Sequence, residues 1–161
     1  MQTSHNHTER HWSQPFSLGL AAITGENSPD QETCASEIQE AGSILLVDDE
    51  IIFLQITSAM LSRLGFTVLI AMDGIDAMEV FRQHKNEIRF VLSDVAMPRM
   101  DGYETMIALR QIVPGIPIIL TSGYSEKQVM EGTHSERPQA FLAKPFGFQI
   151  LKDTIRRISQ E

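Results

Sequence analysis

Five short runs of apolar residues recur along the chain, and each run is unbroken rather than alternating with polar residues. Unbroken runs of this length are typical of β-strands that are covered on both faces of a sheet. Turn-forming or charged residues punctuate the chain between them. The runs occupy residues 44–47, 67–71, 90–93, 116–121 and 140–143.

Segments with apolar residues at helical spacing separate these runs, which predicts helices between the strands. The first runs from Ile52 to Met60 and stops at Gly65. The others begin near Ala77, Tyr103, Ser125 and Phe148, and the segment from Ser125 to about His134 is the most polar. Strands that alternate with helices pair in parallel through right-handed crossovers. The expected fold is α/β, a doubly wound five-stranded parallel sheet with helices on both faces.

Residues 1–42 differ from the rest of the chain in composition. They are rich in Ser, Thr, Gln, His and Glu, they show no sustained period, and they carry one Arg against six acidic residues. Such a segment cannot bury enough apolar surface to offset the entropy of ordering it. We therefore expect a disordered acidic N-terminal tail, followed by one folded domain at residues 43–161.

Charge and composition narrow the function classes. The net charge of −8 argues against general binding to nucleic acids or to membrane surfaces. The single cysteine, Cys34, leaves no internal disulfide and fits a reducing compartment. No apolar stretch is long enough for a membrane span, and the apolar run at residues 16–23 lacks the basic leader of a signal peptide. A cytoplasmic location is expected.

Chemically active side chains stand at the ends of four of the predicted strands. They are Asp48 and Asp49 after the first, Asp94 after the third, Ser122 after the fourth and Lys144 after the fifth. Open α/β sheets bind ligands at the carboxyl ends of their strands. Each residue alone has a local explanation, since acidic pairs favour helix starts and Ser beside Gly is common in turns. Their joint occurrence at one edge favours a functional site.

The chemistry of this set points to phosphoryl transfer. Carboxylates that converge on one edge repel one another unless a cation joins them, and Mg²⁺ is the natural partner of such oxygen ligands. A carboxylate beside Mg²⁺ and a lysine can act as a nucleophile towards a phosphoryl group, giving an aspartyl-phosphate. The cations neutralise the transferred group, and a hydroxyl hydrogen-bonds one of its oxygens.

Four strings resemble, in this order and spacing, those of response-regulator receiver domains, the phosphoacceptor half of two-component signalling. They are ILLVDDE, SDVAMPRMDGYE, IPIILTSGYSE and AFLAKPF. The resemblance covers residues 43 to about 159. It implies the flavodoxin-like strand order 2-1-3-4-5. It also implies a signalling protein that is no enzyme beyond taking a phosphoryl group from a phosphohistidine donor and losing it again.

The resemblance assigns a role to each residue of the predicted site. Asp94 matches the phosphorylated aspartate, and Asp48 and Asp49 match the acidic pair that positions Mg²⁺. Ala96 is expected to offer its backbone carbonyl to the metal. Lys144 matches the invariant lysine, whose bond to the following proline is cis in the family, a geometry that only X-Pro bonds adopt readily.

Two further residues match the family's conformational switch. Ser122 matches the switch hydroxyl, because it lies five residues after Pro117 and twenty-two before Lys144. Thr121 is then expected to face the core. Phe141 matches the aromatic residue whose rotamer follows that hydroxyl, a position that is often Tyr.

The resemblance also implies partners. A sensor histidine kinase or phosphotransfer protein is the expected donor, and a downstream protein is expected to read the face around residues 126–134 and 141–158. Neither nucleic acid nor membrane is an expected partner. One alternative is an intermediate relay, or the detached receiver of a hybrid histidine kinase. Another is a scaffold receiver that does not depend on phosphorylation.

Two other classes fit the residues less well. An aspartate-nucleophile phosphohydrolase needs an acid two residues after the nucleophile, where this chain has Ala96. A nucleotide- or flavin-binding domain needs a glycine-rich loop after the first strand, where this chain has Asp48, Asp49 and Glu50.

Overall fold

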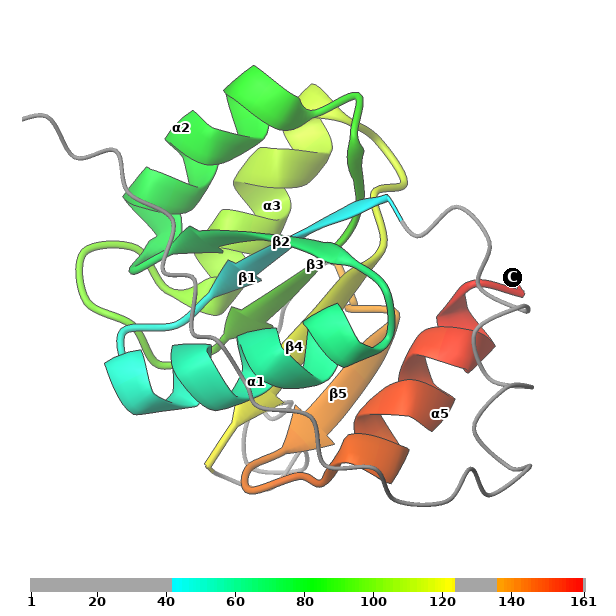
Figure 1. Ribbon diagram of the computed structural model, residues 1–161. Coiled ribbons are helices and arrows are strands. Elements are labelled where there is room, and N and C mark those ends of the chain that lie inside the picture. Colours follow the sequence, from blue (N-terminus) through cyan, green and yellow to red (C-terminus); the bar gives the residue numbers. More distant parts are fainter. Residues whose placement is uncertain (1–41, 124–135, 161) are drawn as a thin grey trace, which may run out of the picture. The chain divides into compact units, whose positions relative to one another are not determined.

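The computed structural model describes residues 42–123 and 136–160 of the chain. Within these ranges it contains five strands and four helices (Figure 1), and none of the helices is long and apolar enough to cross a membrane. The elements are β1 (Ser43–Val47), α1 (Ile51–Arg63), β2 (Thr67–Ala71), α2 (Gly74–His84), β3 (Ile88–Asp94), α3 (Gly102–Ile112), β4 (Ile118–Ser122), β5 (Ala140–Ala143) and α5 (Phe148–Ile158). The helix expected from Ser125 to His134, and the expected tail up to residue 41, lie outside the described residues.

The five strands form one parallel sheet in the order β2-β1-β3-β4-β5. This result confirms the expected α/β fold and its strand order. The chain runs outward from β1 to β2 and then returns past β1 to form β3, so the order reverses between β1 and β3. Ligand sites of open α/β sheets lie at the carboxyl ends of the strands at such a reversal. The sheet therefore places its crevice beside the residues that follow β1 and β3.

Both faces of the sheet are buried, which explains why its strands are continuously apolar. Ile44 and Leu46 of β1 pack into a cluster with α1 and α5, whereas Leu45 and Val47 pack into a second cluster with α2 and α3. Neighbouring residues of one strand thus serve opposite cores, as the alternation of side chains along a strand requires.

The buried face of α1 differs from the one that its periodicity suggests. Ile52 and Ile56, which mark the predicted helix, are 71% and 51% exposed. The side chains that α1 buries are those of Leu54, Thr57 and Leu61. Apolar residues lie on several sides of this helix, so their spacing predicts a helix without fixing the side that meets the sheet.

The fourth strand is displaced from its predicted bounds. The apolar run begins at Ile116, but β4 spans Ile118–Ser122. Pro117 precedes the strand, where its missing N–H costs nothing, and its carbonyl oxygen accepts from the backbone N–H of Val91 at 3.0 Å. Ile116 is buried without belonging to the strand. The shift makes Ser122 the last residue of β4.

Candidate functional site

The carboxyl ends of β1 and β3 bring two buried aspartates to the same edge of the sheet. Val47 lies opposite Ser93 in the register of these strands, and the next residues are Asp48 and Asp94. Asp48 is 1% exposed and Asp94 is 6% exposed. A buried carboxylate needs hydrogen bonds or a positive charge to offset its lost hydration, so the neighbouring side chains decide whether this edge is stable.

Lys144 supplies a positive charge between the two aspartates. Its Nζ lies 2.5 Å from Oδ2 of Asp48 and 2.6 Å from Oδ1 of Asp94. The lysine follows β5, and its backbone N–H donates to the carbonyl oxygen of Ser122 at 2.7 Å. The bond from Lys144 to Pro145 is cis. Residues from the ends of three strands thus meet in one ion-pair cluster.

Burial and pairing shift the pKa values of this cluster. Burial raises the pKa of Asp48, and hydrogen bonds from Lys144 and from the backbone of Glu50 offset that rise only in part. Burial lowers the pKa of Lys144, but its hydrogen bonds to Asp48 and Asp94 outweigh burial, so its pKa lies above the ordinary value. Lys144 is therefore an ammonium cation at neutral pH.

The loop after β3 holds the second carboxylate oxygen of Asp94. The backbone N–H of Ala96 donates to Asp94 Oδ2 at 2.8 Å, and the N–H of Gly102 donates to the carbonyl oxygen of Val95 at 3.0 Å. A Cβ on Gly102 would lie 2.2 Å from the carbonyl oxygen of Asp94. Only glycine permits this close approach, so the start of α3 sets the position of the aspartate's backbone.

An opening of about 470 Å³ connects this cluster to solvent. Asp49, the fourth charged residue of the predicted site, is exposed and lines the opening. The complete lining is Asp49, Glu50, Phe53, Asp94, Ala96, Gly123, Lys144 and Pro145. Asp48, Asp49 and Asp94 carry three negative charges against the one positive charge of Lys144. A divalent cation would balance the remainder.

The donor atoms at this opening fit Mg²⁺. Within residues 42–123 and 136–160, no three Asp, Glu, His or Cys side chains form a group that could hold a metal by themselves. A metal here would therefore need carboxylates together with a backbone carbonyl and water. Mg²⁺ is usually bound in this way, by one or two carboxylates and several waters. Of the expected ligands, Asp49, Asp94 and Ala96 line the opening and would hold it, whereas Asp48 contacts Lys144 and does not line the opening.

Both residues with a hydroxyl at the end of β4 are buried, and one of them lies close to Asp94. Ser122 is 1% exposed. Thr121 is equally buried, yet its Oγ1 lies 3.4 Å from Oδ1 of Asp94, which is long for a hydrogen bond between oxygens. The sequence predicted only that Thr121 faces the core. Its nearness to the site follows from the register that pairs Asp94 with Thr121, which the sequence does not reveal.

Phe141 occupies a position on β5 opposite Leu120. Its ring is half-buried and packs against the cluster on the α2 and α3 side of the sheet. The side chain is thus neither locked in the core nor free in solvent.

Two aromatic residues that the sequence did not single out adjoin the lysine. The Nζ of Lys144 lies 3.9 Å from the centre of the Phe53 ring. Phe146 meets the same ring edge-on, with 5.4 Å between the ring centres and an angle of 87°. Phe53 belongs to α1 and is distant in sequence from Lys144, so no local pattern could have predicted the contact.

A second contact missed by the sequence ties the β3–α3 loop to α2. Arg99 adopts a left-handed backbone conformation with φ of 66°, and its Nε donates to Asp73 Oδ2 at 2.7 Å. Its Nη2 also contacts Asp73 and lies 3.0 Å from Oδ1 of Asp76. Asp73 in turn caps α2 by accepting from the backbone N–H groups of Ile75 and Asp76. The loop that carries Ala96 is thereby anchored at a second point.

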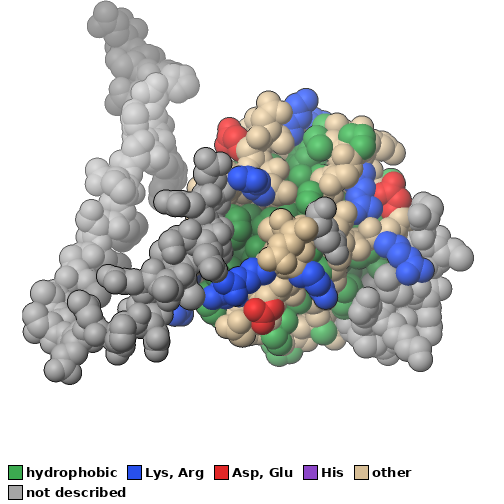
Figure 2. All heavy atoms as spheres, turned by 90° about the vertical axis from the view of Figure 1, so that its right-hand side faces the viewer, with side chains coloured by type: hydrophobic (Ala, Val, Ile, Leu, Met, Phe, Trp, Pro, Cys, Tyr) green, Lys and Arg blue, Asp and Glu red, His purple; other side chains and the backbone are tan. Residues whose placement is uncertain are grey.

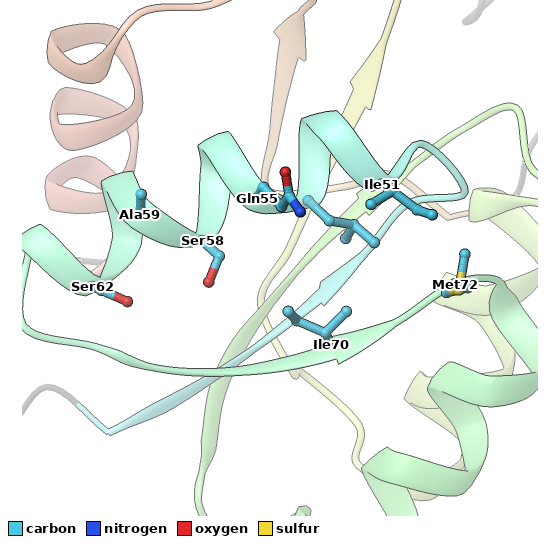
Figure 3. Close-up of a pocket in the computed structure, with 8 residues that line it drawn as sticks. Ile51, Gln55, Ser58, Ala59, Ser62, Ile70 and Met72 are labelled. Carbon is cyan, nitrogen blue, oxygen red and sulfur yellow. The ribbon is translucent and has the colours of Figure 1, made fainter. Parts of the chain in front are cut away.

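An apolar groove lies on another side of α1, away from these charges (Figure 3). Ser58 of α1 and Ile70 of β2 face each other across it. Its volume is about 550 Å³, and its lining is Ile51, Leu54, Gln55, Ser58, Ala59, Ser62, Ile70 and Met72. None of these side chains is charged or nucleophilic enough for the predicted chemistry, so the groove is no competing active site.

The sheet order and the lysine-bridged aspartates at its reversal point define the class of protein. The chain matches the family model described as the response regulator receiver domain over residues 44–156, and it belongs to that family. Individual relatives agree. It is 33% identical over 128 residues to the sensor kinase CckA of Brucella abortus, and 32% identical over 116 residues to the transcriptional regulatory protein ZraR of Klebsiella oxytoca.

These matches cover 79% and 72% of this chain, but the chain spans only 13% of CckA and 26% of ZraR. What those whole proteins do is therefore not carried over to it. The solved structure of the chemotaxis protein CheY4 of Vibrio cholerae is 30% identical, with a TM-score of 0.65. That match covers 72% of this chain and 97% of the solved one.

Proposed function

We propose that this receiver domain takes a phosphoryl group from a phosphohistidine donor onto Asp94, with Mg²⁺, and signals through protein contacts that depend on phosphorylation. The placement of Asp94 carries the proposal. Its carboxylate ends β3, lies 2.6 Å from the ammonium of Lys144, and lines an opening to solvent together with Asp49. A nucleophile, a cation and an acidic metal ligand thus share one accessible space.

The proposed transfer uses the side chains that meet at this opening. A carboxylate oxygen of Asp94 attacks the phosphorus, the bond from phosphorus to the donor imidazole breaks, and its electron pair returns to the ring nitrogen, which then takes a proton. Lys144 exchanges its contact with Asp94 for one with a phosphoryl oxygen, while Asp48 still holds it. Mg²⁺, when bound, adds positive charge beside the transferred oxygens.

Phosphoryl uptake from a small donor tests the proposal directly. With Mg²⁺ and acetyl phosphate, the intact mass of the protein should rise by one phosphoryl group, and EDTA should abolish the rise. Asp94→Asn should gain no mass. Asp101→Asn is the matched control, because asparagine can replace Asp101 as the cap of α3. Uptake by Asp94→Asn, or equal uptake with EDTA, would contradict the assignment.

The signal would leave through the face formed by β5 and α5. A phosphoryl group on Asp94 would draw the Ser122 hydroxyl towards it, and the half-buried ring of Phe141 could fill the space. Phosphorylation raises the affinity of a partner only to the extent that the partner binds the phosphorylated conformation more tightly than the unphosphorylated one. Lys and Arg side chains gather on the side of the molecule that carries α5 (Figure 2), with Arg156 and Arg157 in its last turn. This charge favours a partner with an acidic surface.

A relay role within a hybrid kinase is the second candidate. The resemblance to CckA, whose name is that of a sensor kinase, favours it. In a relay, phosphorylated protein should lose its phosphoryl group rapidly to the histidine of an added phosphotransfer protein. In an end-point receiver, it should bind its partner and keep the group. For either role we infer a cytoplasmic location, which agrees with the single cysteine of the chain, Cys34.

A further inference from the structure

The ring of Phe53 covers the ammonium group on which the site depends. Phe53 lies in the first turn of α1, directly after the acidic segment that follows β1. Side chains of a helix lean towards its N-terminus, so this ring leans over the carboxyl edge of the sheet. There it lies 3.9 Å from Nζ of Lys144 and forms part of the wall of the opening.

The ring is itself held in place. Phe146 is 8% exposed and belongs to the core cluster on the α1 and α5 side. It meets the Phe53 ring edge-on at 87°, which is the favourable arrangement for two aromatic quadrupoles. The face of Phe53 is therefore kept towards Lys144 rather than free to turn away.

Charge and geometry give this contact a specific effect. The face of an aromatic ring is negative and attracts an ammonium group. Lysine has a long, flexible side chain whose charge is a point rather than a fixed fork. Contacts with two carboxylates and with a ring face therefore hold the Nζ of Lys144 next to Asp94.

We propose that Phe53 is a positioning residue of the site, and that its ring electrons hold the Lys144 ammonium where it can meet the incoming phosphoryl group. The proposal rests on the proposed function, since it concerns the rate at which Asp94 is phosphorylated. A purely structural role for Phe53 predicts something different, namely that any apolar side chain of similar volume serves equally well.

Substitutions that change the ring electrons but not the volume separate the two roles. Phenylalanines with one, two and three fluorine atoms, placed at position 53 alone, present a progressively weaker negative face. With Mg²⁺ and acetyl phosphate, the initial rate of phosphoryl uptake should fall stepwise, to a total of roughly twofold to tenfold. The rate of Phe53→Leu should be at least as low as that of the trifluorinated protein. The rate of Phe53→Tyr should equal that of wild type.

Phe148→Leu is the matched control. Its ring lies 4.8 Å from the guanidinium carbon of Arg63 and lines no part of the opening, so this substitution removes a comparable contact elsewhere and should leave the rate unchanged. A flat fluorine series, or a Phe53→Leu protein as fast as wild type, would overturn the proposal.

A second measurement needs no phosphate. Protons near the face of an aromatic ring resonate upfield, so the ε-methylene signals of Lys144 should move downfield in Phe53→Leu and keep their position in Phe53→Tyr. If, without phosphate, these signals have the same position in Phe53→Leu as in wild type, the contact itself is refuted. If the expected downfield shift is seen but wild type takes up no phosphoryl group, the contact is present and the proposed function is wrong.

Discussion

Replacing Lys144 by methionine should destabilise the fold as well as the site. The substitution keeps an unbranched side chain but removes the ammonium that contacts Asp48 and Asp94. Asp48 is 1% exposed, so water cannot take over the role of the lysine. A buried charge left without its partner costs about 3–5 kcal/mol.

The lower end of that range applies here. The Lys144 side chain is 14% exposed, and Asp94 borders an opening to solvent, so part of the lost charge is replaced by hydration. We expect the free energy of unfolding to fall by about 3 kcal/mol. For a domain of this size, that loss lowers Tm by about 12 °C.

Urea unfolding at pH 7 in the presence of EDTA measures this loss without metal. The double variant Lys144→Met/Asp48→Asn should recover at least half of it, because the more deeply buried of the two carboxylates that lose the ammonium is then neutral. Lys85→Met, at an exposed lysine, should change stability by no more than about 0.5 kcal/mol. A single variant as stable as wild type, or a double variant that recovers nothing, would refute the reasoning.

Three further predictions concern the loops and the switch. Burial raises the pKa of Asp73, but hydrogen bonds from the backbone N–H of Asp76 and from Arg99 outweigh it and hold the pKa below the ordinary value of an aspartate. The charged carboxylate therefore stabilises the fold at a pH above that ordinary value, and the advantage of wild type over Asp73→Asn in urea unfolding should vanish as the pH falls through the lowered pKa. Gly102→Ala should lower the free energy of unfolding by about 1–3 kcal/mol and slow phosphoryl uptake, because its Cβ meets the backbone of Asp94. In the control Gly147→Ala nothing lies within 4 Å of the Cβ, so thermal unfolding should show a loss below about 1 kcal/mol. Ser122→Ala should still take up phosphate, but the chemical-shift changes across β5 and α5 on phosphorylation should shrink; changes equal to those of wild type would exclude the hydroxyl as the trigger.

The unbroken apolar runs predicted most of the fold. Leu45 and Leu46 are adjacent and both fully apolar, and such a pair fits only a strand with a core on each side. Helix faces were harder to predict. In α1 the exposed Ile52 and the buried Leu54 have similar hydrophobicity, so the choice between them is made by packing against the sheet rather than by the sequence of the helix.

The convergence of Asp48, Asp94 and Lys144 could be predicted because each stands at the end of a strand, and parallel strands end at one edge. The distances between these side chains could not be predicted from the sequence, because they depend on the register of four strands. The same limit explains why Thr121 and Phe53 were missed. Both reach the site through tertiary packing, and neither differs locally from an ordinary core residue.

The ion-pair cluster joins the ends of three strands, so the order in which the strands are synthesised decides when it can form. During synthesis Asp48, Asp49 and Asp94 are made first, and Lys144 follows only after β4 and β5. Until β5 has joined the sheet, the aspartates lack their cation. Under the proposed function, Asp94 in such a half-built domain lacks the ammonium that would meet the phosphoryl group, so we expect no phosphoryl uptake before β5 has paired. Phosphoryl uptake would then occur only in chains whose sheet is complete.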